Sequence, residues 1–290
     1  MTAFDQLGTE ARDAAGADLD LRSTPELVEL MNTEDATVPA AVAGASAQIA
    51  LLIDGVVSRL AANGRLVYVG AGTSGGLAAL DAAECGPTFG ADDIVFAVST
   101  RQESEEDDGQ AGARAIGELL VTAADAVVGI SASGRSPFVR GALEASKAAG
   151  ALTGCVVCVH GSELAALVAH EVAVPVGAEV LAGSTRLKAG TAQKLVLNMI
   201  STISMIRLGR TYGNLMVGLD PANEKLQARA RSIVAQATGA ANGEVEQALS
   251  AAEGDARVAI VSLLTGLDAA ASRARLDEAS GIVRRAVEGS

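Results

Sequence analysis

Two short stretches of the sequence combine glycine with serine or threonine directly after an apolar run, and a helical pattern follows each. They are GAGTSG (70–75) and SASGRS (131–136). A helix N-terminus presents free N–H groups and a partial positive charge, so it binds phosphate. Hydroxyl groups add hydrogen bonds there without filling space. The two turns therefore predict a phosphate site, whose candidate ligands are Thr73, Ser74, Ser131, Ser133 and Ser136.

The first turn also fits the GxGxxG pattern of dinucleotide-binding proteins. Those proteins need an acid at the end of the second strand to hold the ribose. Here the second apolar run ends in Ser99-Thr100, without an acid. A dinucleotide site remains an alternative, but phosphate explains both hydroxyl-bearing turns.

Short apolar runs alternate with Ala-rich helical stretches from residue 65 onward. The runs are 65–70, 94–99, 126–131, 152–159 and 171–176. Unbroken Val/Ile runs separated by helices are typical of a parallel sheet covered on both faces. We predict an α/β three-layer sandwich with a mostly parallel five-stranded sheet. Ligands of such sheets bind at the carboxyl ends of the strands, where both turns lie.

Three segments follow from these patterns. Residues 1–60 read as helices that pack on the core, residues 61–222 as the α/β domain that contains the predicted phosphate site, and residues 223–290 as a small helical C-terminal domain. A long helical stretch, 185–208, is apolar on several faces and is expected to be buried, by this chain or by a partner.

Composition excludes several classes of partner. The 290 residues are 49% hydrophobic and carry a formal net charge of −13, which argues against a nucleic-acid partner. The N-terminus lacks the basic segment followed by an apolar segment that is typical of a signal peptide. The apolar runs are also shorter than the roughly 20 residues that span a bilayer. We expect a soluble cytoplasmic protein without a membrane partner.

Cysteine and histidine offer little for a metal site. Cys155 and Cys158 form a CxxC pair, but they lie in a buried-strand pattern and are expected to be small core residues. Of the two histidines, His160 follows a strand and is a candidate site residue, whereas His170 begins a strand and is expected to be structural. We predict no metal site.

Three longer stretches carry a resemblance to a known family. GAGTSGGLAALDAAEC, SASGRSPFV and LAGSTRLKAGTAQKLVLNMIST resemble the sugar isomerase (SIS) fold and, more closely, the N-acetylmuramic acid 6-phosphate etherases. The resemblance covers most of the chain, including DLDLRSTPELVELMN and VAIVSLLTGLDA. Glucokinase regulatory protein is a relative of this family that binds sugar phosphates without etherase chemistry.

The resemblance implies a lyase that cleaves the D-lactyl ether of N-acetylmuramic acid 6-phosphate and needs no cofactor. It also implies a homodimer with its site near the subunit interface. Glu84 matches the family's catalytic acid, and partial burial there would raise its pKa and keep a proton available.

The second catalytic carboxylate falls in the acidic run ESEEDD (103–108). The nearest match to the family places it at Glu106, with Glu103 and Glu105 as competing registers. The chain is also shorter than the family just before this run. Glu179, Lys188 and Lys194 resemble family positions near the sugar.

Several departures from the family leave other functions open. Gly76 stands where the family has Arg, Gly86 where it has Pro, and Val159 where it has Asn. A non-catalytic sugar-phosphate-binding regulator is one alternative, and it predicts that Glu84 and Glu106 do not face one pocket. An aldose–ketose sugar-phosphate isomerase is another.

Overall fold

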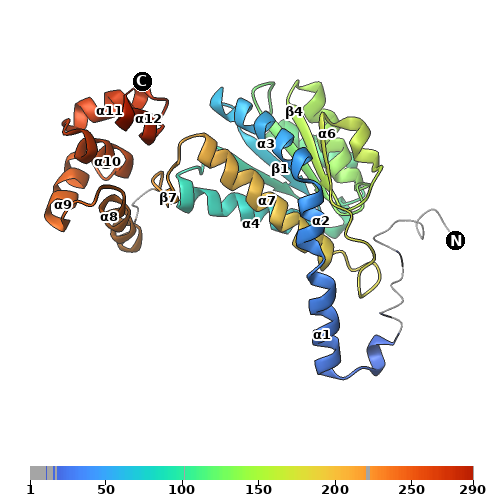
Figure 1. Ribbon diagram of the computed structural model, residues 1–290. Helices are drawn as coiled ribbons and strands as arrows, with labels where there is room; N and C mark the ends of the chain where they lie inside the picture. The colour runs from blue at the N-terminus through green and yellow to red at the C-terminus, as the bar shows by residue number, and fades with distance from the viewer. Residues whose placement is uncertain (1–10, 12–15, 17, 101, 220–222, 290) are drawn as a thin grey trace. The chain divides into compact units, whose positions relative to one another are not determined.

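The computed structural model describes residues 11, 16, 18–100, 102–219 and 223–289 (Figure 1). The chain forms two compact units. Unit 1 comprises Met1–Ala82 and Ile94–Ser201, and unit 2 comprises Ala83–Asp93 and Thr202–Ser290. Two helices, α4 (Gly72–Phe89) and α7 (Lys188–Arg207), have residues in both units. The segments 1–60, 61–222 and 223–290 group the chain by type of element, and that division stays a prediction.

Unit 1 is built on a parallel sheet of five strands in the order β2-β1-β3-β4-β5. The strands are β1 (Leu66–Gly70), β2 (Val95–Ser99), β3 (Ala126–Ser131), β4 (Leu152–Val157) and β5 (His170–Ala173). Each overlaps one of the five predicted apolar runs. Every residue of β1 and β3 is buried, as unbroken Val/Ile runs require. The predicted parallel sheet is confirmed.

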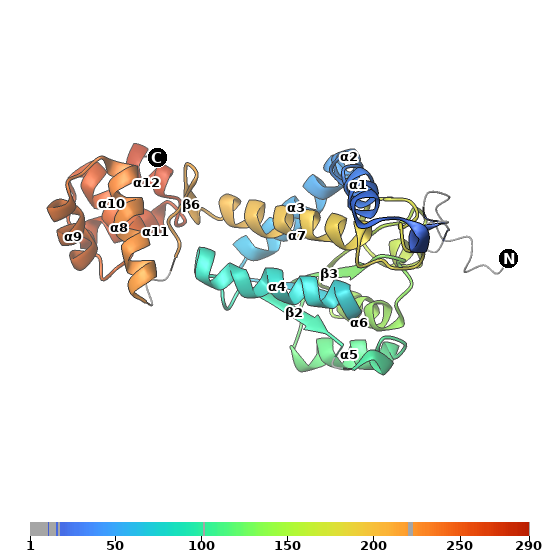
Figure 2. The same cartoon turned by 90° about the horizontal axis from the view of Figure 1, so that it is seen from below.

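Helices cover both faces of the sheet (Figure 2). α3 (Ser46–Ala61) contacts four of the strands on one face. On the other face, α6 (Pro137–Ala148) packs against β1, β3 and β4, and α5 (Gly109–Glu118) packs against α6. Phe138, Val139 and Leu143 of α6 are buried there with alternate residues of the strands. This arrangement is the predicted three-layer sandwich.

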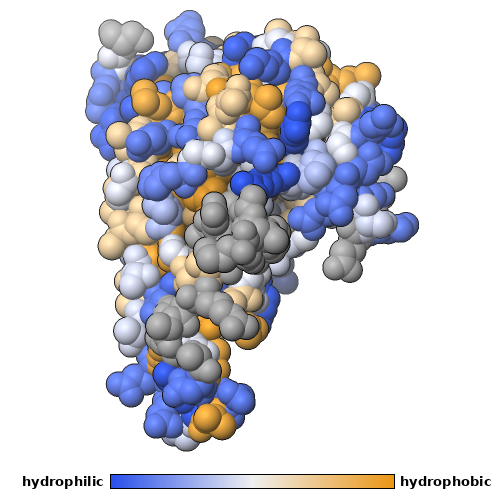
Figure 3. Space-filling view, turned by 90° about the vertical axis from the view of Figure 1, so that its right-hand side faces the viewer, coloured by the Kyte–Doolittle hydropathy of each residue, from blue (hydrophilic) through white to orange (hydrophobic). Residues whose placement is uncertain are grey.

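The N-terminal part of unit 1 is helical, with much apolar surface left exposed. It consists of η2 (Leu19–Leu21), α1 (Thr24–Asp35) and α2 (Val38–Gly44) ahead of α3. α1 begins with a capping box between Ser23 and Glu26 and has no buried residue. Leu21, Val28 and Met31 are 82%, 55% and 40% exposed. Figure 3 shows a few hydrophobic groups among mostly hydrophilic ones at the lower end of the view, where η2 and α1 lie.

No single helix among the described residues is both long and apolar enough to cross a bilayer. One bent pair, Thr24–Gly44 with Ser46–Ala61, passes that test by length and composition, with a 60° bend between its halves.

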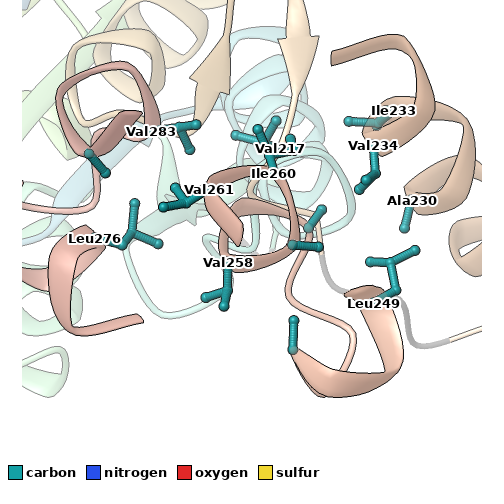
Figure 4. Close-up of a cluster of buried hydrophobic side chains, with 14 of the residues drawn as sticks. Val217, Ala230, Ile233, Val234, Leu249, Val258, Ile260, Val261, Leu276 and Val283 are labelled. Carbon is teal, nitrogen blue, oxygen red and sulfur yellow. The ribbon is translucent and has the colours of Figure 1, made fainter. Parts of the chain in front are cut away.

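Unit 2 is a bundle of short helices with one small hairpin, as predicted for the C-terminal region. Its elements are β6 (Thr211–Tyr212), β7 (Leu215–Met216), α8 (Glu224–Thr238), α9 (Asn242–Ala251), α10 (Ala256–Thr265), α11 (Ala269–Glu278) and α12 (Val283–Glu288). α10 contacts the four other helices, and its Val258, Ile260 and Val261 are fully buried at their centre (Figure 4). The remaining short helices, η3 (Glu103–Glu105) and η4 (Glu163–Leu167), belong to unit 1.

Candidate active site

The first glycine turn joins β1 to α4 more tightly than residues with a Cβ would permit. Gly72 has a φ of 52°, a left-handed value that favours glycine. A Cβ on Gly70 would lie 2.7 Å from the backbone nitrogen of Gly75, and a Cβ on Gly75 would lie 2.9 Å from the Cβ of Ser99. The glycines thus bring the N-terminus of α4 directly against the ends of β1 and β2.

Two of the three serines in the second turn, from β3 to α6, differ in their contacts. The Oγ of Ser131 accepts a hydrogen bond from the backbone N–H of Gly134 at 3.1 Å, so this hydroxyl holds the turn. Ser136 is the N-cap residue of α6, yet its side chain makes no cap hydrogen bond. Its Oγ is buried and has no hydrogen-bond partner among the described residues. Ser136 therefore has a hydroxyl available for a ligand.

Both turns lie at the same edge of the sheet. β1 and β3 are adjacent and parallel, with Gly70 paired to Ile130, so the two turns start next to each other. Ser74 and Ser133 are half-buried, and Thr73 is exposed. The N-termini of an 18-residue and a 12-residue helix therefore lie at this edge of the sheet, and a phosphate site there stays a prediction.

Glu106 lies against the first turn and against the helix that follows the second turn. Its carboxylate oxygen Oε2 lies 3.7 Å from the point where a Cβ on Gly72 would stand. Its backbone oxygen accepts from the N–H of Phe138, in the first turn of α6, at 3.1 Å. The structure thus brings a half-buried carboxylate to the glycine turns, at the residue that the nearest family match selected.

The two competing acids of the run are placed differently. Glu105 lines a cavity of about 420 Å³ between β2 and α5, together with Ser99, Arg114 and Phe138. Glu103 has a side chain outside the described part of the chain. Farther along, Asp108 caps α5 by accepting from the N–H groups of Gln110 and Ala111. The bond from Ala111 is the largest of the contacts that lower the pKa of Asp108.

Glu84 does not have the partial burial expected from the sequence. It lies on α4 but belongs to unit 2, and its side chain is exposed. The buried side of α4 carries Ala78, Asp81 and Cys85, spaced by three and four residues. Glu84 and Leu80, which is 50% exposed, lie on the adjacent, solvent-facing side of the helix. Helical periodicity therefore turns Glu84 away from the core of this chain.

Glu179 and Lys188 both have partners within the protein. The carboxylate of Glu179 is fully buried and accepts from the backbone N–H groups of Lys188 and Ala189, at 3.0 and 2.9 Å. It therefore caps the N-terminus of α7. The Nζ of Lys188 pairs with Glu34 of α1 at 2.6 Å, and the lysine is 4% exposed. Direct contact of either residue with a substrate stays a prediction.

Two polar contacts join α4 to α7, and they involve two residues not singled out from the sequence, Asp81 and Gln193. The Oγ of Ser74 donates to Oε1 of Gln193 at 2.9 Å, and Nζ of Lys194 donates to Oδ1 of Asp81 at 2.7 Å. In the sequence, only the polar string AQK within KAGTAQK pointed to Gln193 and Lys194. Their partners in α4 lie 119 and 113 residues away along the chain, so the sequence pattern did not reveal these contacts.

The cysteines are core residues, as predicted. Cys155 is in β4 and Cys158 follows it, and both thiols are buried. Burial raises the pKa of each thiol to about 12, so neither is ionised near neutral pH. His160 is exposed, and His170 begins β5. Within the described residues, no group of three His, Cys, Asp or Glu side chains forms a metal-binding cluster.

Comparison with known proteins bears on the fold and the family of this chain. A model of the glucokinase regulatory protein N-terminal SIS domain matches residues 48–147, which include both glycine turns and Glu106. Among solved structures, a phosphoheptose isomerase from Francisella tularensis covers 64% of this chain and 100% of its own, with a TM-score of 0.52 and 17% identity. That likeness shows the fold.

Two curated relatives match nearly the whole chain. The N-acetylmuramic acid 6-phosphate etherase of Streptomyces avermitilis is 51% identical, over 98% of this chain and 94% of its own. The etherase of Rubrobacter xylanophilus is 52% identical, over 97% of this chain and 96% of its own. On these likenesses, the chain belongs to the N-acetylmuramic acid 6-phosphate etherase family.

Proposed function

We propose that this protein is a carbon–oxygen lyase that converts N-acetylmuramic acid 6-phosphate into N-acetylglucosamine 6-phosphate and D-lactate, a reaction of cell-wall sugar recycling. Relatives that share about half of its residues bear the name of this activity. The observation that carries the proposal is the position of Glu106. Its half-buried carboxylate lies against the glycine of one hydroxyl-bearing turn, and its backbone oxygen accepts a hydrogen bond from the helix that follows the other turn.

The two turns form the phosphate subsite of the proposed reaction. Thr73 and Ser74 come from the first turn, and Ser131, Ser133 and Ser136 from the second. The buried hydroxyl of Ser136 supports this assignment, because such groups normally have a hydrogen-bond partner and this one has none among the described residues. A phosphate oxygen at the N-terminus of α6 would supply that partner.

The chemistry requires one base and one acid. The sugar ring opens to its aldehyde, which acidifies the proton on carbon 2. A base removes that proton, the bond from carbon 3 to the lactyl oxygen breaks, and an acid protonates the departing oxygen. Water then adds to the unsaturated aldehyde at carbon 3. We assign Glu106 as the base and Glu84 as the acid. No redox change occurs in this sequence.

The exposure of Glu84 supports a homodimer with the site near its interface. An acid must hold a proton near neutral pH, and burial of a carboxyl raises its pKa. This chain leaves Glu84 exposed, so a second copy would have to cover it. α7 likewise exposes Met199, Ile203 and Ile206 along one side. A cytoplasmic location, and contact of Glu179 and Lys188 with the sugar, belong to the same proposal.

The test incubates the purified protein with N-acetylmuramic acid 6-phosphate and measures D-lactate. Wild type is expected to release lactate, and Glu84→Gln and Glu106→Gln are expected to lower kcat by about 100-fold or more. Glu105→Gln is the matched control, because it removes the neighbouring acid that faces the cavity between β2 and α5. Circular dichroism checks that each variant is folded.

Other outcomes identify the alternatives. Saturable binding of the sugar phosphate without lactate release would make the protein a binding regulator, as the match to the glucokinase regulatory protein domain allows. Formation of a ketose phosphate from an aldose phosphate would make it an isomerase. Equal activity of Glu106→Gln and wild type would remove Glu106 from the mechanism.

A further inference from the structure

One contact of the candidate phosphate subsite involves a buried amide that the proposed reaction leaves without a role. The hydroxyl of Ser74 donates to Oε1 of Gln193 at 2.9 Å. Gln193 is 1% exposed. Its Nε2, at the other end of the amide, is buried and has no hydrogen-bond partner among the described residues. A buried NH2 group without partners is costly, since it has lost its hydrogen bonds to water.

This arrangement conflicts with the role of Ser74 as a phosphate ligand. A serine hydroxyl has one proton and can donate one hydrogen bond. A phosphate dianion accepts hydrogen bonds and offers none. While Ser74 donates to Gln193, its hydroxyl presents only oxygen lone pairs to the phosphate, and that contact would be repulsive.

A half-turn of the Gln193 amide removes the conflict at Ser74. The two ends of the amide have the same shape, so the same pocket accepts either orientation. After the turn, Nε2 donates to the Oγ of Ser74, and the Ser74 proton is free to point at the phosphate. We propose that Gln193 is the positioning residue of the phosphate subsite, which makes Ser74 a donor when a sugar phosphate binds. This inference rests on the proposed function.

Neighbouring contacts hold Gln193 in place for this task. The next residue of α7, Lys194, pairs with Asp81 of α4 at 2.7 Å, and Asp81 is 4% exposed. At the start of α7, the buried carboxylate of Glu179 caps the helix. α7 is thus fastened on both sides of Gln193, so the amide can turn while its backbone stays at a constant distance from Ser74.

The test compares Gln193→Met and Gln193→Glu, each alone and in a Ser74→Ala background. Binding of N-acetylglucosamine 6-phosphate is measured by calorimetry, with unphosphorylated N-acetylglucosamine as the ligand control. Met keeps the volume and removes the donor, so we expect about 10-fold weaker binding. Glu accepts the Ser74 proton and adds a negative charge, so we expect about 100-fold weaker binding or more. Thr191→Ala, an exposed change on the same helix, is the matched control.

The double variants separate positioning from a merely structural role. If Gln193 acts through Ser74, Gln193→Met has no further effect on binding once Ser74 is Ala. The inference is overturned if Gln193→Met weakens binding equally in both backgrounds, or if Gln193→Met binds as tightly as wild type. Either result leaves the proposed function standing. If Ser74→Ala itself binds as tightly as wild type, or if wild type binds no sugar phosphate, the phosphate subsite of the proposed function fails and the inference fails with it. Thermal melting confirms that each variant is folded.

Discussion

Serines 131 and 136 come from one motif, yet their surroundings give them different tasks. The hydroxyl of Ser131 is engaged with the backbone of its own turn, whereas that of Ser136 is buried without a partner among the described residues. A buried hydroxyl that makes no hydrogen bond costs free energy on folding, and a bound phosphate would supply the missing partner. At the scale of single residues, Ser136 is therefore the sharpest test of the phosphate subsite.

We expect Ser136→Ala to weaken sugar-phosphate binding without destabilising the protein. The loss should be about 10-fold in the KM for N-acetylmuramic acid 6-phosphate, because one hydrogen bond to a charged group is removed. The melting temperature should stay the same or rise slightly, because no hydrogen bond of the folded chain is lost.

Ser146→Ala on the same helix is the matched control. Ser146 is also fully buried, but its Oγ donates to the backbone oxygen of Ala142 at 2.7 Å. This variant should lower the melting temperature and leave KM unchanged. The opposite pattern, with KM raised by Ser146→Ala and not by Ser136→Ala, would contradict the assignment.

At the scale of elements, one buried carboxylate joins β1 to β3 at the end of the strands opposite the turns. Asp125, just before β3, accepts from the backbone N–H, Nε and Nη2 of Arg65, just before β1, at 2.9, 3.1 and 2.9 Å. It also accepts from the N–H of Thr122. Burial alone would raise the pKa of Asp125, but the hydrogen bonds from Arg65 and Thr122 outweigh burial and lower it.

Asp125→Asn should lower the free energy of unfolding by about 2 kcal/mol at pH 7, because the neutral amide replaces a buried charge that pairs with Arg65. Etherase activity per folded molecule should be unchanged, since the pair lies at the other edge of the sheet. Urea unfolding followed by circular dichroism measures the difference. Glu144→Gln, which breaks an exposed pair with Arg140, is the control and should cost less than about 1 kcal/mol.

The same pair sets a direction for the pH dependence. Because the pKa of Asp125 is lower in the folded than in the unfolded protein, its contribution is complete above the unfolded pKa of about 4. It is lost as the pH falls through the lower folded value. The difference between wild type and Asp125→Asn should thus be constant from pH 7 to about 5 and shrink below about pH 4. A difference that grows in acid would contradict this account.

At the scale of the whole molecule, α7 is buried on one side only. Six apolar residues of this helix are fully buried: Ala189, Ala192, Val196, Leu197, Ile200 and Met205. Met199, Ile203 and Ile206 are 36%, 38% and 47% exposed, and their spacing by four and three residues aligns them on one side of the helix. The burial expected for this helix is therefore confirmed for one side, and the exposed stripe favours a second copy as its cover.

Replacing Met199 and Ile203 together by Glu should convert the proposed homodimer into a monomer, because the interface would bury two charges without partners. Sedimentation velocity over a range of concentrations measures the assembly. Leu120→Glu is the control, since this leucine is 76% exposed and stands apart from α7. A monomeric wild type, or a double variant that still forms dimers, would refute the interface.

Local order was largely predictable from the sequence. The apolar run 126–131 coincides with β3, and a glycine of each turn adopts a left-handed φ, 52° at Gly72 and 67° at Gly134, which glycine takes without steric cost. Strands, turns and helix ends depend on residues a few positions apart, so a pattern of neighbours was enough to place them and to place the five hydroxyl residues at one edge of the sheet.

The tertiary structure alone decided which side chains meet. The acidic run contained several candidates, and only packing brought the carboxylate of Glu106 to Gly72. From the sequence, helical periodicity could not tell whether Glu84 faces the core or solvent. The contacts of α4 show which side of the helix is buried. The contact between Ser74 and Gln193 joins residues 119 positions apart. Such contacts depend on how whole elements pack, and neighbouring residues in the chain carry no record of that packing.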